Sequence, residues 1–197
     1  MSKTHSGNIE VRRTVLGSEE PFNALVDPAV GFECDKYVWF LSPSGYAWSV
    51  MNGKPKTLHR FVFELLGIIP KGMVIDHKEG DRLDERMEKL RLATVQQNNM
   101  NRSVNKNNIL GIKGVYQRAE TKFKDSYRAQ ITINHIHYSL GDYADKYVAS
   151  YAYNLAAVAL FGDWAWLNEL PTDFDYVAAR AALSPKVLSF AVAGGID

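Results

Sequence analysis

Residues 58–102, LHRFVFELLGIIPKGMVIDHKEGDRLDERMEKLRLATVQQNNMNR, decide the fold of the first half of the chain. Apolar residues recur at helical spacing at the start of this stretch, and two short apolar runs follow on either side of a polar segment. The expected order is a helix over 58–66, a strand over 73–77, a loop over 78–89, a strand over 90–93 and a helix over 94–101.

The ends of the two helices carry recognisable signals. Gly67 and Pro70 stop the first helix, because neither residue continues a helix well. Thr94 and Gln97 have the spacing of a capping box, in which each side chain bonds the backbone N–H of the other residue. This pattern predicts that the second helix starts at Thr94.

Three polar side chains of this stretch form a candidate catalytic group. Asp76 and His77 end the first strand, and Asn98 comes one turn into the last helix. An imidazole with a pKa near ~6.5 takes a proton from water at neutral pH. Carboxylate and carboxamide oxygens suit Mg²⁺, and a hydrated Mg²⁺ beside a base is sufficient to hydrolyse a phosphodiester. Alternatively, Asp76 caps the loop and His77 is a partly buried strand residue.

Further residues at specific spacing extend this pattern. They are Leu58-His59-Arg60, Pro70-x-Gly72, Asp76-His77-x-x-Gly80-Asp81, Arg86, Leu90-Arg91, Ala93-Thr94, Gln97-Asn98 and Asn101-Arg102. With these residues, the stretch resembles the HNH endonuclease family of the homing and phage type. Tyr37-x-Trp39 and Gly45-Tyr46-Ala47 also resemble the β-hairpin that precedes the motif in these proteins.

The resemblance implies a ββα-metal fold and a role for each residue of the group. His77 would be the general base, and Asp76 and Asn98 would hold one divalent ion, Mg²⁺ with Mn²⁺ as a possible substitute, against the scissile phosphate. We expect His59 to pack against this site and Arg60 to meet a phosphate. No Cys pairs flank the motif, which excludes the zinc-stapled subtype.

One residue departs from the family pattern. Lys89 stands where the family has a middle Asn, whose amide ties the long loop to itself and so positions the base. A Lys has donors but no acceptor, so it cannot replace both halves of that bridge. We expect its side chain to point to solvent or to a phosphate. Asp84 and Glu85 also replace frequent Asn residues, and we expect them to add negative charge near the DNA path.

Outside this stretch the chain predicts a hairpin and a second β-rich segment. Residues 36–50 form two β-type runs around a Ser-Pro-Ser-Gly turn, and Asn52-Gly53 is a further turn signal. After a polar linker, the expected elements are strands over 113–118, 127–134 and 136–140, a helix over 145–160 that Gly162 ends, and a last helix over 175–183 before Pro185.

The second segment has its own set of matching residues. They are Gly114-Val115, Tyr127-Arg128-Ala129-Gln130-Ile131, Leu140-Gly141, Ala152-Tyr153, Ala156-Ala157, Phe161-Gly162 and Leu167-Asn168. With them, residues 112–168 resemble the plant AP-two/ERF-type DNA-binding domain, which lays one face of a three-stranded sheet in the major groove. The implied DNA contacts are Lys113, Tyr116, Arg118, Gln130, Thr132, His137 and Ser139.

The alternation of side chains along a strand predicts which residues lie on this face of the sheet. It puts Gln130 and Thr132 on one side, and we expect Arg128 and Ile131 to flank or oppose it. Glutamine can read adenine, and arginine can read guanine. The alternative is a structural α+β appendage with a solvated polar face.

Charge is distributed unevenly along the chain. The net charge of +1 argues against a nucleic-acid binder, but the window 91–134 holds eight Lys and Arg against two acids. A solvated charged face is the alternative explanation. Further candidate DNA contacts are Arg60, Arg91, Arg102 and Arg128.

Composition limits the class of protein. A chain of 197 residues with 46% hydrophobic and 23% charged residues is ordinary for a globular protein rather than a disordered one. The single cysteine, Cys34, excludes an internal disulfide and a Cys-based zinc site. We see neither a signal peptide nor a membrane span, and we expect a cytoplasmic location.

Together these patterns predict an α+β chain with a ββα-metal nuclease module followed by a three-stranded antiparallel sheet and a helix. The expected boundaries are an N-terminal extension (1–30), the nuclease module (31–105), the DNA-binding domain (111–168) and a C-terminal helical extension (169–197). The expected function is metal-dependent hydrolysis of phosphodiester bonds of double-stranded DNA at selected sites, and a double-strand break would need a homodimer or a second encounter. The alternatives are a DNA-binding regulatory protein that has lost cleavage, and an interaction protein without DNA affinity.

Overall fold

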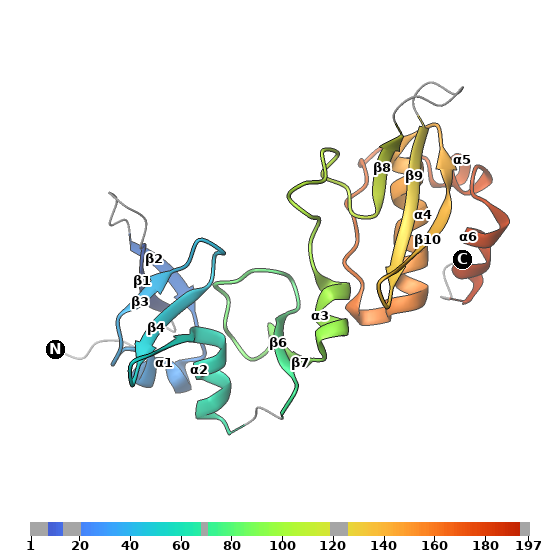
Figure 1. Ribbon diagram of the computed structural model, residues 1–197. Coiled ribbons are helices and arrows are strands. Elements are labelled where there is room, and N and C mark those ends of the chain that lie inside the picture. The colour runs from blue at the N-terminus through green and yellow to red at the C-terminus, as the bar shows by residue number, and fades with distance from the viewer. Residues whose placement is uncertain (1–7, 14–20, 68–70, 119–125, 194–197) are drawn as a thin grey trace. The chain divides into compact units, whose positions relative to one another are not determined.

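The computed structural model describes residues 8–13, 21–67, 71–118 and 126–193 of the chain (Figure 1). The chain divides into two compact units, residues 1–98 and 99–197. Each contains both strands and helices, so the architecture is α+β, as expected. Pro70, the charged residues of 119–125 and the Gly194-Gly195 tail lie outside the described residues.

The first unit contains a five-stranded sheet with the order β2-β1-β3-β4-β5. Its strands are β1 (Asn8–Arg13), β2 (Pro21–Leu25), β3 (Trp39–Leu41), β4 (Ala47–Met51) and β5 (Lys54–Thr57). The predicted hairpin is confirmed as the antiparallel pair β3–β4. Asn52 and Gly53 have φ values of 51° and 74°, as a tight turn between β4 and β5 requires.

Three strands of the first unit, β1, β2 and β5, and one helix have no counterpart in the sequence prediction. β1 pairs antiparallel with β2 and parallel with β3, so the N-terminal residues extend the sheet. α1 (Pro28–Cys34) and α2 (Leu58–Leu65) contribute Val30, Cys34, Phe61 and Val62 to the core around Trp39, whose indole N–H donates to the carbonyl of Cys34. Burial raises the pKa of the Cys34 thiol to about 12, which keeps it unreactive.

The strand–loop–strand–helix order of the decisive stretch is confirmed. β6 (Val74–His77) and β7 (Leu90–Ala93) pair antiparallel, and α3 (Val95–Asn101) follows directly. The capping box is present: the Thr94 N–H donates to Gln97 Oε1 at 2.9 Å, and the Gln97 N–H donates to Thr94 Oγ1 at 3.1 Å.

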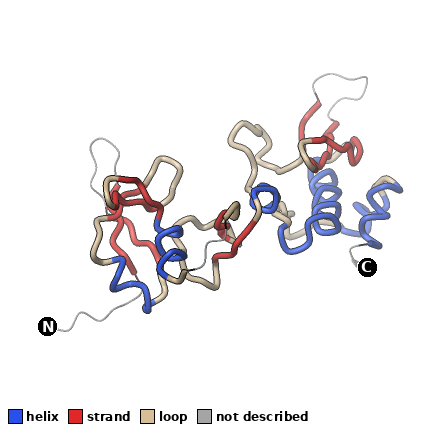
Figure 2. Tube along the Cα trace, turned by 60° about the horizontal axis from the view of Figure 1, so that its bottom comes forward, coloured by secondary structure: helices blue, strands red, loops and turns tan. Residues whose placement is uncertain are grey.

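The second unit is a three-stranded antiparallel sheet covered on one face by a long helix (Figures 1 and 2). The strands are β8 (Val115–Arg118), β9 (Ser126–Ile133) and β10 (Ile136–Tyr143), and the helix is α4 (Lys146–Phe161). Asp145 caps the helix by accepting from the N–H groups of Tyr147 and Val148, and Gly162 ends it, as expected.

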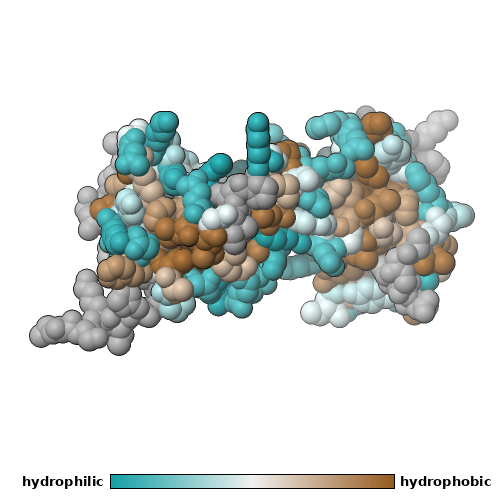
Figure 3. Space-filling view, turned by 90° about the horizontal axis from the view of Figure 1, so that it is seen from below, coloured by the Kyte–Doolittle hydropathy of each residue, from teal (hydrophilic) through white to brown (hydrophobic). Residues whose placement is uncertain are grey.

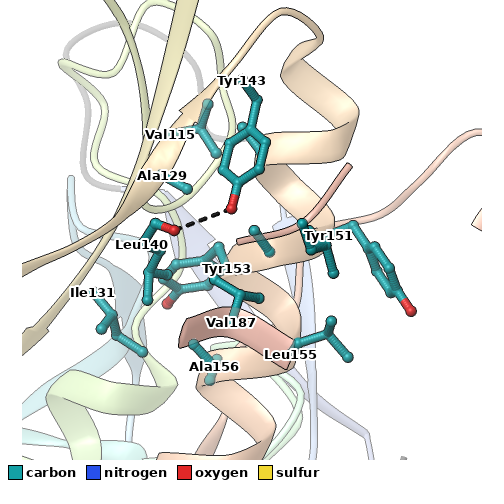
Figure 4. Packing of buried hydrophobic residues seen from close by; sticks show 14 of the residues in the cluster. Val115, Ala129, Ile131, Leu140, Tyr143, Tyr151, Tyr153, Leu155, Ala156 and Val187 are labelled. Atoms are coloured by element: carbon teal, nitrogen blue, oxygen red, sulfur yellow. Dashed lines mark hydrogen bonds between the residues drawn. The ribbon is translucent and has the colours of Figure 1, made fainter. Parts of the chain in front are cut away.

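The core of this unit lies between the sheet and α4 (Figure 4). Ala129 and Ile131 alternate with exposed or half-buried residues along β9, so only one face of the strand is apolar. The Tyr143 hydroxyl donates to the carbonyl of Leu140 at 3.0 Å within this core. Gly114 allows the chain to pass directly over the ring of Tyr153, where a Cβ atom would overlap the ring.

The C-terminal segment also joins this core. A short 3-10 turn, η1 (Gly162–Trp164), precedes α5 (Tyr176–Ala181) and α6 (Pro185–Ala193). The expected last helix is present as α5, but a further helix begins at Pro185, so the expectation that Pro185 ends the helical region is wrong. Proline is favoured in the first turn of a helix, where its missing N–H costs nothing. Val187 of α6 is fully buried against α4.

Across the described residues, no helix is long and apolar enough to cross a membrane. Figure 3 shows hydrophobic side chains in patches among hydrophilic ones on the face that it displays. The large exposed apolar residues, such as Ile109 and Val177, are scattered along the sequence.

Candidate active site

The candidate base and its neighbouring carboxylate lie at the end of β6, in the interior of the first unit. Asp76 is 4% exposed and His77 is 6% exposed. Arg91 stands opposite Asp76 in the β6–β7 register, and its Nε donates to Asp76 Oδ2 at 2.8 Å. The alternation of β6 sends Asp76 and His77 to opposite faces, so the two side chains have different surroundings.

The ring of His77 faces a buried glutamate from the long loop. His77 Nε2 lies 3.0 Å from Glu85 Oε2, and Glu85 is fully buried. Backbone bonds fix this part of the loop, because the Glu85 N–H donates to the carbonyl of Leu25 and the Leu25 N–H donates to the carbonyl of Leu83. The end of β2 therefore holds Glu85 beneath His77.

Asp84 and Glu85, which we expect to add negative charge near the DNA path, are both buried. The Arg86 guanidinium makes two bonds to Asp84 and holds the pKa of that carboxyl below its usual value. Burial raises the pKa of Glu85. These two carboxylates therefore organise the loop from inside.

A second histidine packs on the same carboxylate. The ring of His59, from the first turn of α2, lies edge-on to that of His77 with centroids 5.4 Å apart. His59 Nδ1 lies 3.9 Å from Glu85 Oε1, and its Nε2 lies 3.0 Å from Thr57 Oγ1. Burial lowers the pKa of His59 to about 3, so this ring is neutral at pH 7. Tyr46 closes the group, with its ring centroid 5.3 Å from that of His59.

Two sets of side chains here have the chemistry of metal ligands. Asp76 and Asn98 offer hard oxygen atoms, from the end of β6 and from the half-buried face of α3. This donor set fits Mg²⁺, which prefers oxygen and keeps several waters. His59, His77 and Glu85 each offer one ligand atom, and these atoms lie within 4.8 Å of one another.

The long loop is tied together without the family's middle Asn. Lys89 Nζ bonds Glu79 Oε1 at 2.7 Å, so its side chain runs along the surface of the loop and pairs with a carboxylate. Lys78 makes the second link, because its Nζ donates to the carbonyl of Glu88 and its N–H donates to the carbonyl of Lys89. Two lysines thus make the cross-loop bonds that an Asn side chain could make alone.

Comparison with known proteins agrees with this geometry. Residues 56–100 match the HNH endonuclease family, which covers α2, β6, the loop, β7 and most of α3. The chain is 36% identical over 137 residues, 68% of each chain, to a protein named "Uncharacterized HNH endonuclease L560" from Acanthamoeba polyphaga mimivirus. The chain belongs to the HNH endonuclease family. It is accordingly a DNA endonuclease of the HNH type.

A second relative of the HNH endonuclease comes from a phage. Protein 3.8 of Escherichia phage T7 is 36% identical over 66 residues, which are 34% of this chain and 52% of that protein. No solved structure matches the chain.

Some of the Lys and Arg residues that we expect to contact DNA are exposed in the HNH endonuclease, and others are bonded to groups inside the protein. Arg60 is exposed and bonds Glu64 on the surface of α2, and Arg102 is exposed. Arg91 is mostly buried on Asp76. Lys113 is also mostly buried, and its Nζ donates to the carbonyls of Met100 and Arg102 at 2.6 Å each. Burial lowers the pKa of Lys113 to about 8. When charged, its ammonium group stabilises the carbonyl groups at the C-terminal end of α3.

The remaining expected contacts lie together on the sheet of the second unit. Continuous pairing of β9 places Arg128, Gln130 and Thr132 on one face, so the expectation that Arg128 flanks or opposes Gln130 is wrong. Their partners across the sheet extend this face, which is opposite to the buried positions beneath α4. The face comprises Tyr116, Arg118, Arg128, Gln130, Thr132, His137, Ser139 and Asp142.

An ion-pair network occupies part of this sheet face. Arg128 makes two bonds of 2.9 Å to Asp142, and Arg118 Nη1 lies 3.1 Å from Asp142 Oδ2. The Arg128 guanidinium holds the pKa of Asp142 below its usual value. Thr132 Oγ1 lies 2.8 Å from His137 Nδ1 at the other end. One carboxylate thus partly offsets two of the expected DNA-binding arginines.

Sequence reasoning missed two functional candidates. Glu85 lies in a polar, charge-dense loop, and only its position where the family often has Asn could have singled it out. Asp142 follows the Leu140-Gly141 pair, and its place opposite Arg128 depends on the β-bulge between Ser139 and Gly141. Neither a loop contact nor a bulge register can be read from local spacing.

Proposed function

We propose that the HNH endonuclease hydrolyses phosphodiester bonds of double-stranded DNA with His77 as general base and one divalent ion held by Asp76 and Asn98. The observation that carries this proposal is the buried Asp76-His77 pair, whose imidazole is bonded to Glu85. In this reading β6, β7 and α3 make up a ββα-metal site. Mg²⁺ is the expected ion and Mn²⁺ its substitute, because both ligand atoms are hard oxygens.

His77 would take the proton from the attacking water. With Nε2 bonded to Glu85, the base has to use Nδ1, and the carboxylate stabilises the imidazolium that forms. When bound, the divalent ion supplies charge stabilisation at the scissile phosphate and the leaving oxygen. Arg91 holds the Asp76 carboxylate from the neighbouring strand and so orients the ligand.

The exposed face of the β8–β9–β10 sheet, opposite α4, would bind the major groove and recognise the DNA sequence. A ribbon of this kind fits the major groove, and the face combines a glutamine, two arginines and small hydroxyl groups. This supports the proposed AP-two/ERF-like domain over 111–168. Along the chain it follows the proposed nuclease module over 31–105, and residues 1–30 and 169–197 are the proposed extensions. The break of the chain into two compact units at residue 98 supports two modules.

A single site of this kind cuts one strand. A double-strand break would therefore need a homodimer or a second encounter. Relatives from a mimivirus and a phage support the homing or phage type.

A supercoiled plasmid assay tests the proposal. We expect nicking with Mg²⁺ or Mn²⁺, none with chelator, and loss in both His77→Ala and Asn98→Ala. Glu33→Gln, an exposed carboxylate on α1, is a matched control that should nick normally. Binding without nicking in any metal would instead support the alternative, a DNA-binding regulatory protein that keeps the HNH fold. Equal nicking by His77→Ala would reject His77 as the base.

A further inference from the structure

His59, His77 and Glu85 form a compact group that the proposed Mg²⁺ chemistry does not use as ligands. They come from α2, the end of β6 and the long loop, and their ligand atoms lie within 4.8 Å of one another. Among the described residues, no other group of three His, Cys, Asp or Glu side chains meets this condition. The group is also set in the interior, with Glu85 fully buried.

Two of its atoms lack the partners that buried polar atoms normally have. His59 Nδ1 and Glu85 Oε1 are shielded from solvent and have no hydrogen-bond partner in the described part of the chain. They face each other at 3.9 Å, which is too long for a hydrogen bond. Leaving such groups unsatisfied in a protein interior is costly, so this pair of atoms points to a bound species.

A metal cation is the species that fits both atoms. A cation accepts an electron pair from a neutral imidazole nitrogen and another from a negatively charged carboxylate oxygen. A single proton cannot bridge two atoms that are 3.9 Å apart, because this distance is too long for a hydrogen bond. Burial keeps His59 neutral at pH 7, which is the form that binds metal. Thr57 Oγ1 contacts the other ring nitrogen of His59, as outer contacts do in metal sites.

The donor set selects the kind of metal. Two imidazoles and one carboxylate are a typical three-ligand set for zinc, with water as the fourth ligand, whereas Mg²⁺ prefers oxygen alone. Zinc bonds of ~2.1 Å in a tetrahedron place ligand atoms roughly 3.4 Å apart. His77 Nε2 lies 3.0 Å from Glu85 Oε2 and His59 Nδ1 lies 3.9 Å from Glu85 Oε1, so the two separations, one to each carboxylate oxygen, fall on either side of that value.

We propose that His59, His77 and Glu85 bind a zinc-class transition-metal ion at a site separate from Asp76 and Asn98, and that its occupation stops DNA cleavage. The inhibitory part rests on the proposed role of His77 as general base. For Nε2 of neutral His77 to give its electron pair to a cation, the single ring proton has to move to Nδ1, and Nδ1 can then no longer take a proton from water. The hydrogen bond between His77 and Glu85 would also be replaced by bonds to the metal.

Cobalt titration of the full chain tests binding without reference to cleavage. We expect one Co²⁺ per chain to give the intense visible absorption of a four-coordinate site, and Zn²⁺ to remove it. His59→Gln and Glu85→Gln should weaken binding on the order of 100-fold or more, beyond what loss of an outer contact causes. Asn98→Ala and Glu33→Gln should bind Co²⁺ like the wild type.

The outcomes separate the two proposals. Absence of the Co²⁺ band in the wild type, or an equal band in His59→Gln, would overturn the metal site while leaving the nuclease proposal intact. If the wild type nicks DNA, one equivalent of Zn²⁺ in excess Mg²⁺ should lower the rate at least about tenfold, and His59→Gln should resist this inhibition. Equal inhibition of His59→Gln would overturn the inhibitory role.

Variants of buried residues can fail to fold. A measurement on the wild type alone therefore tests the metal site independently. Zn²⁺ should raise its melting temperature while Mg²⁺ at the same concentration does not, because only the folded chain assembles the three ligands. Equal shifts with both ions would contradict a transition-metal site.

Discussion

His77 and Glu85 are bonded to each other in the interior of the first unit, with Nε2 and Oε2 3.0 Å apart. When Glu85 is ionised its carboxylate only accepts, and the proton of this bond then sits on Nε2. The pair therefore fixes both the tautomer and the orientation of the imidazole. It does so from a position that the sheet strand β2 holds through backbone bonds to the loop.

Replacing Glu85 should impair catalysis more than DNA binding. In Glu85→Ala the Nε2 proton loses its acceptor, and we expect kcat for nicking to fall 10–100-fold, as for other partners that orient a catalytic histidine. Glu85→Gln keeps an acceptor oxygen and should lose less. KM should stay within about twofold in both, because Glu85 is buried and does not reach the substrate. A matched rise in KM would show a loss of structure instead.

The neutral His59 should make the protein sensitive to acid. Its folded-state pKa of about 3 lies below the unfolded value near 6.5, so the unfolded chain binds the additional proton as pH falls below ~6.5. Stability from this group is therefore present at neutral pH and is lost on acidification. Between pH 7 and pH 5 the wild type should lose about 2 kcal/mol more unfolding free energy than His59→Gln.

Urea denaturation at the two pH values, with chelator present, measures this difference. The comparison with His59→Gln removes the contributions of other groups that titrate in the same range. Equal pH dependence in the two proteins would show that His59 ionises normally in the folded state.

Local signals were sufficient for the strand–loop–strand–helix order around His77. The capping residues Thr94 and Gln97 and the two apolar runs act within a few residues of sequence, and the structure contains each of them as predicted. The same is true of the turn at Asn52-Gly53. In these segments short-range chemistry and the final fold agree.

Long-range contacts could not be predicted in this way. β1 pairs in parallel with β3 across more than twenty intervening residues, and no local pattern encodes that choice of partner. Glu85 is similar, because a glutamate in a polar loop predicts exposure until the backbone of Leu25 fixes the loop. α6 was missed because its proline signals both a helix end and a helix start.

The departure at Lys89 should have little effect on activity. Its bond to Glu79 is on the surface, where solvent screens an ion pair and leaves it a small contribution to stability, and the backbone bond from Lys78 to Lys89 does not need the side chain. We expect Lys89→Asn and Lys89→Ala to change the nicking rate by no more than about threefold. A large gain in Lys89→Asn would show that the lysine misplaces the loop and would favour the weakened-nuclease alternative.

Neutralising Asp142 should strengthen DNA binding. Asp142→Asn releases Arg118 and Arg128 from their carboxylate, so up to about two further cations can meet phosphates. Fluorescence anisotropy with a DNA duplex should then show tighter binding at low salt. The plot of log affinity against log salt should be steeper by up to about two. Unchanged affinity and slope would indicate that this sheet face does not contact DNA.

Gly114 should be essential for the second unit. A Cβ atom there would lie 2.1 Å from Tyr153 Cδ2 and 2.7 Å from the carbonyl oxygen of Gln130, and the residue has φ +72°. Both neighbours are buried or part of the sheet, so neither can move cheaply. We expect Gly114→Ala to lower the unfolding free energy of this unit by roughly 3 kcal/mol or more.

Gly111→Ala is the matched control, because Gly111 has a similar φ of +65° but no atom within 4 Å of its would-be Cβ. It should cost only the backbone strain of about 1–2 kcal/mol. Urea melts of both variants measure the difference, and far-UV circular dichroism reports whether the sheet and α4 survive. Equal costs for the two substitutions would mean that Tyr153 does not pack over Gly114 in solution.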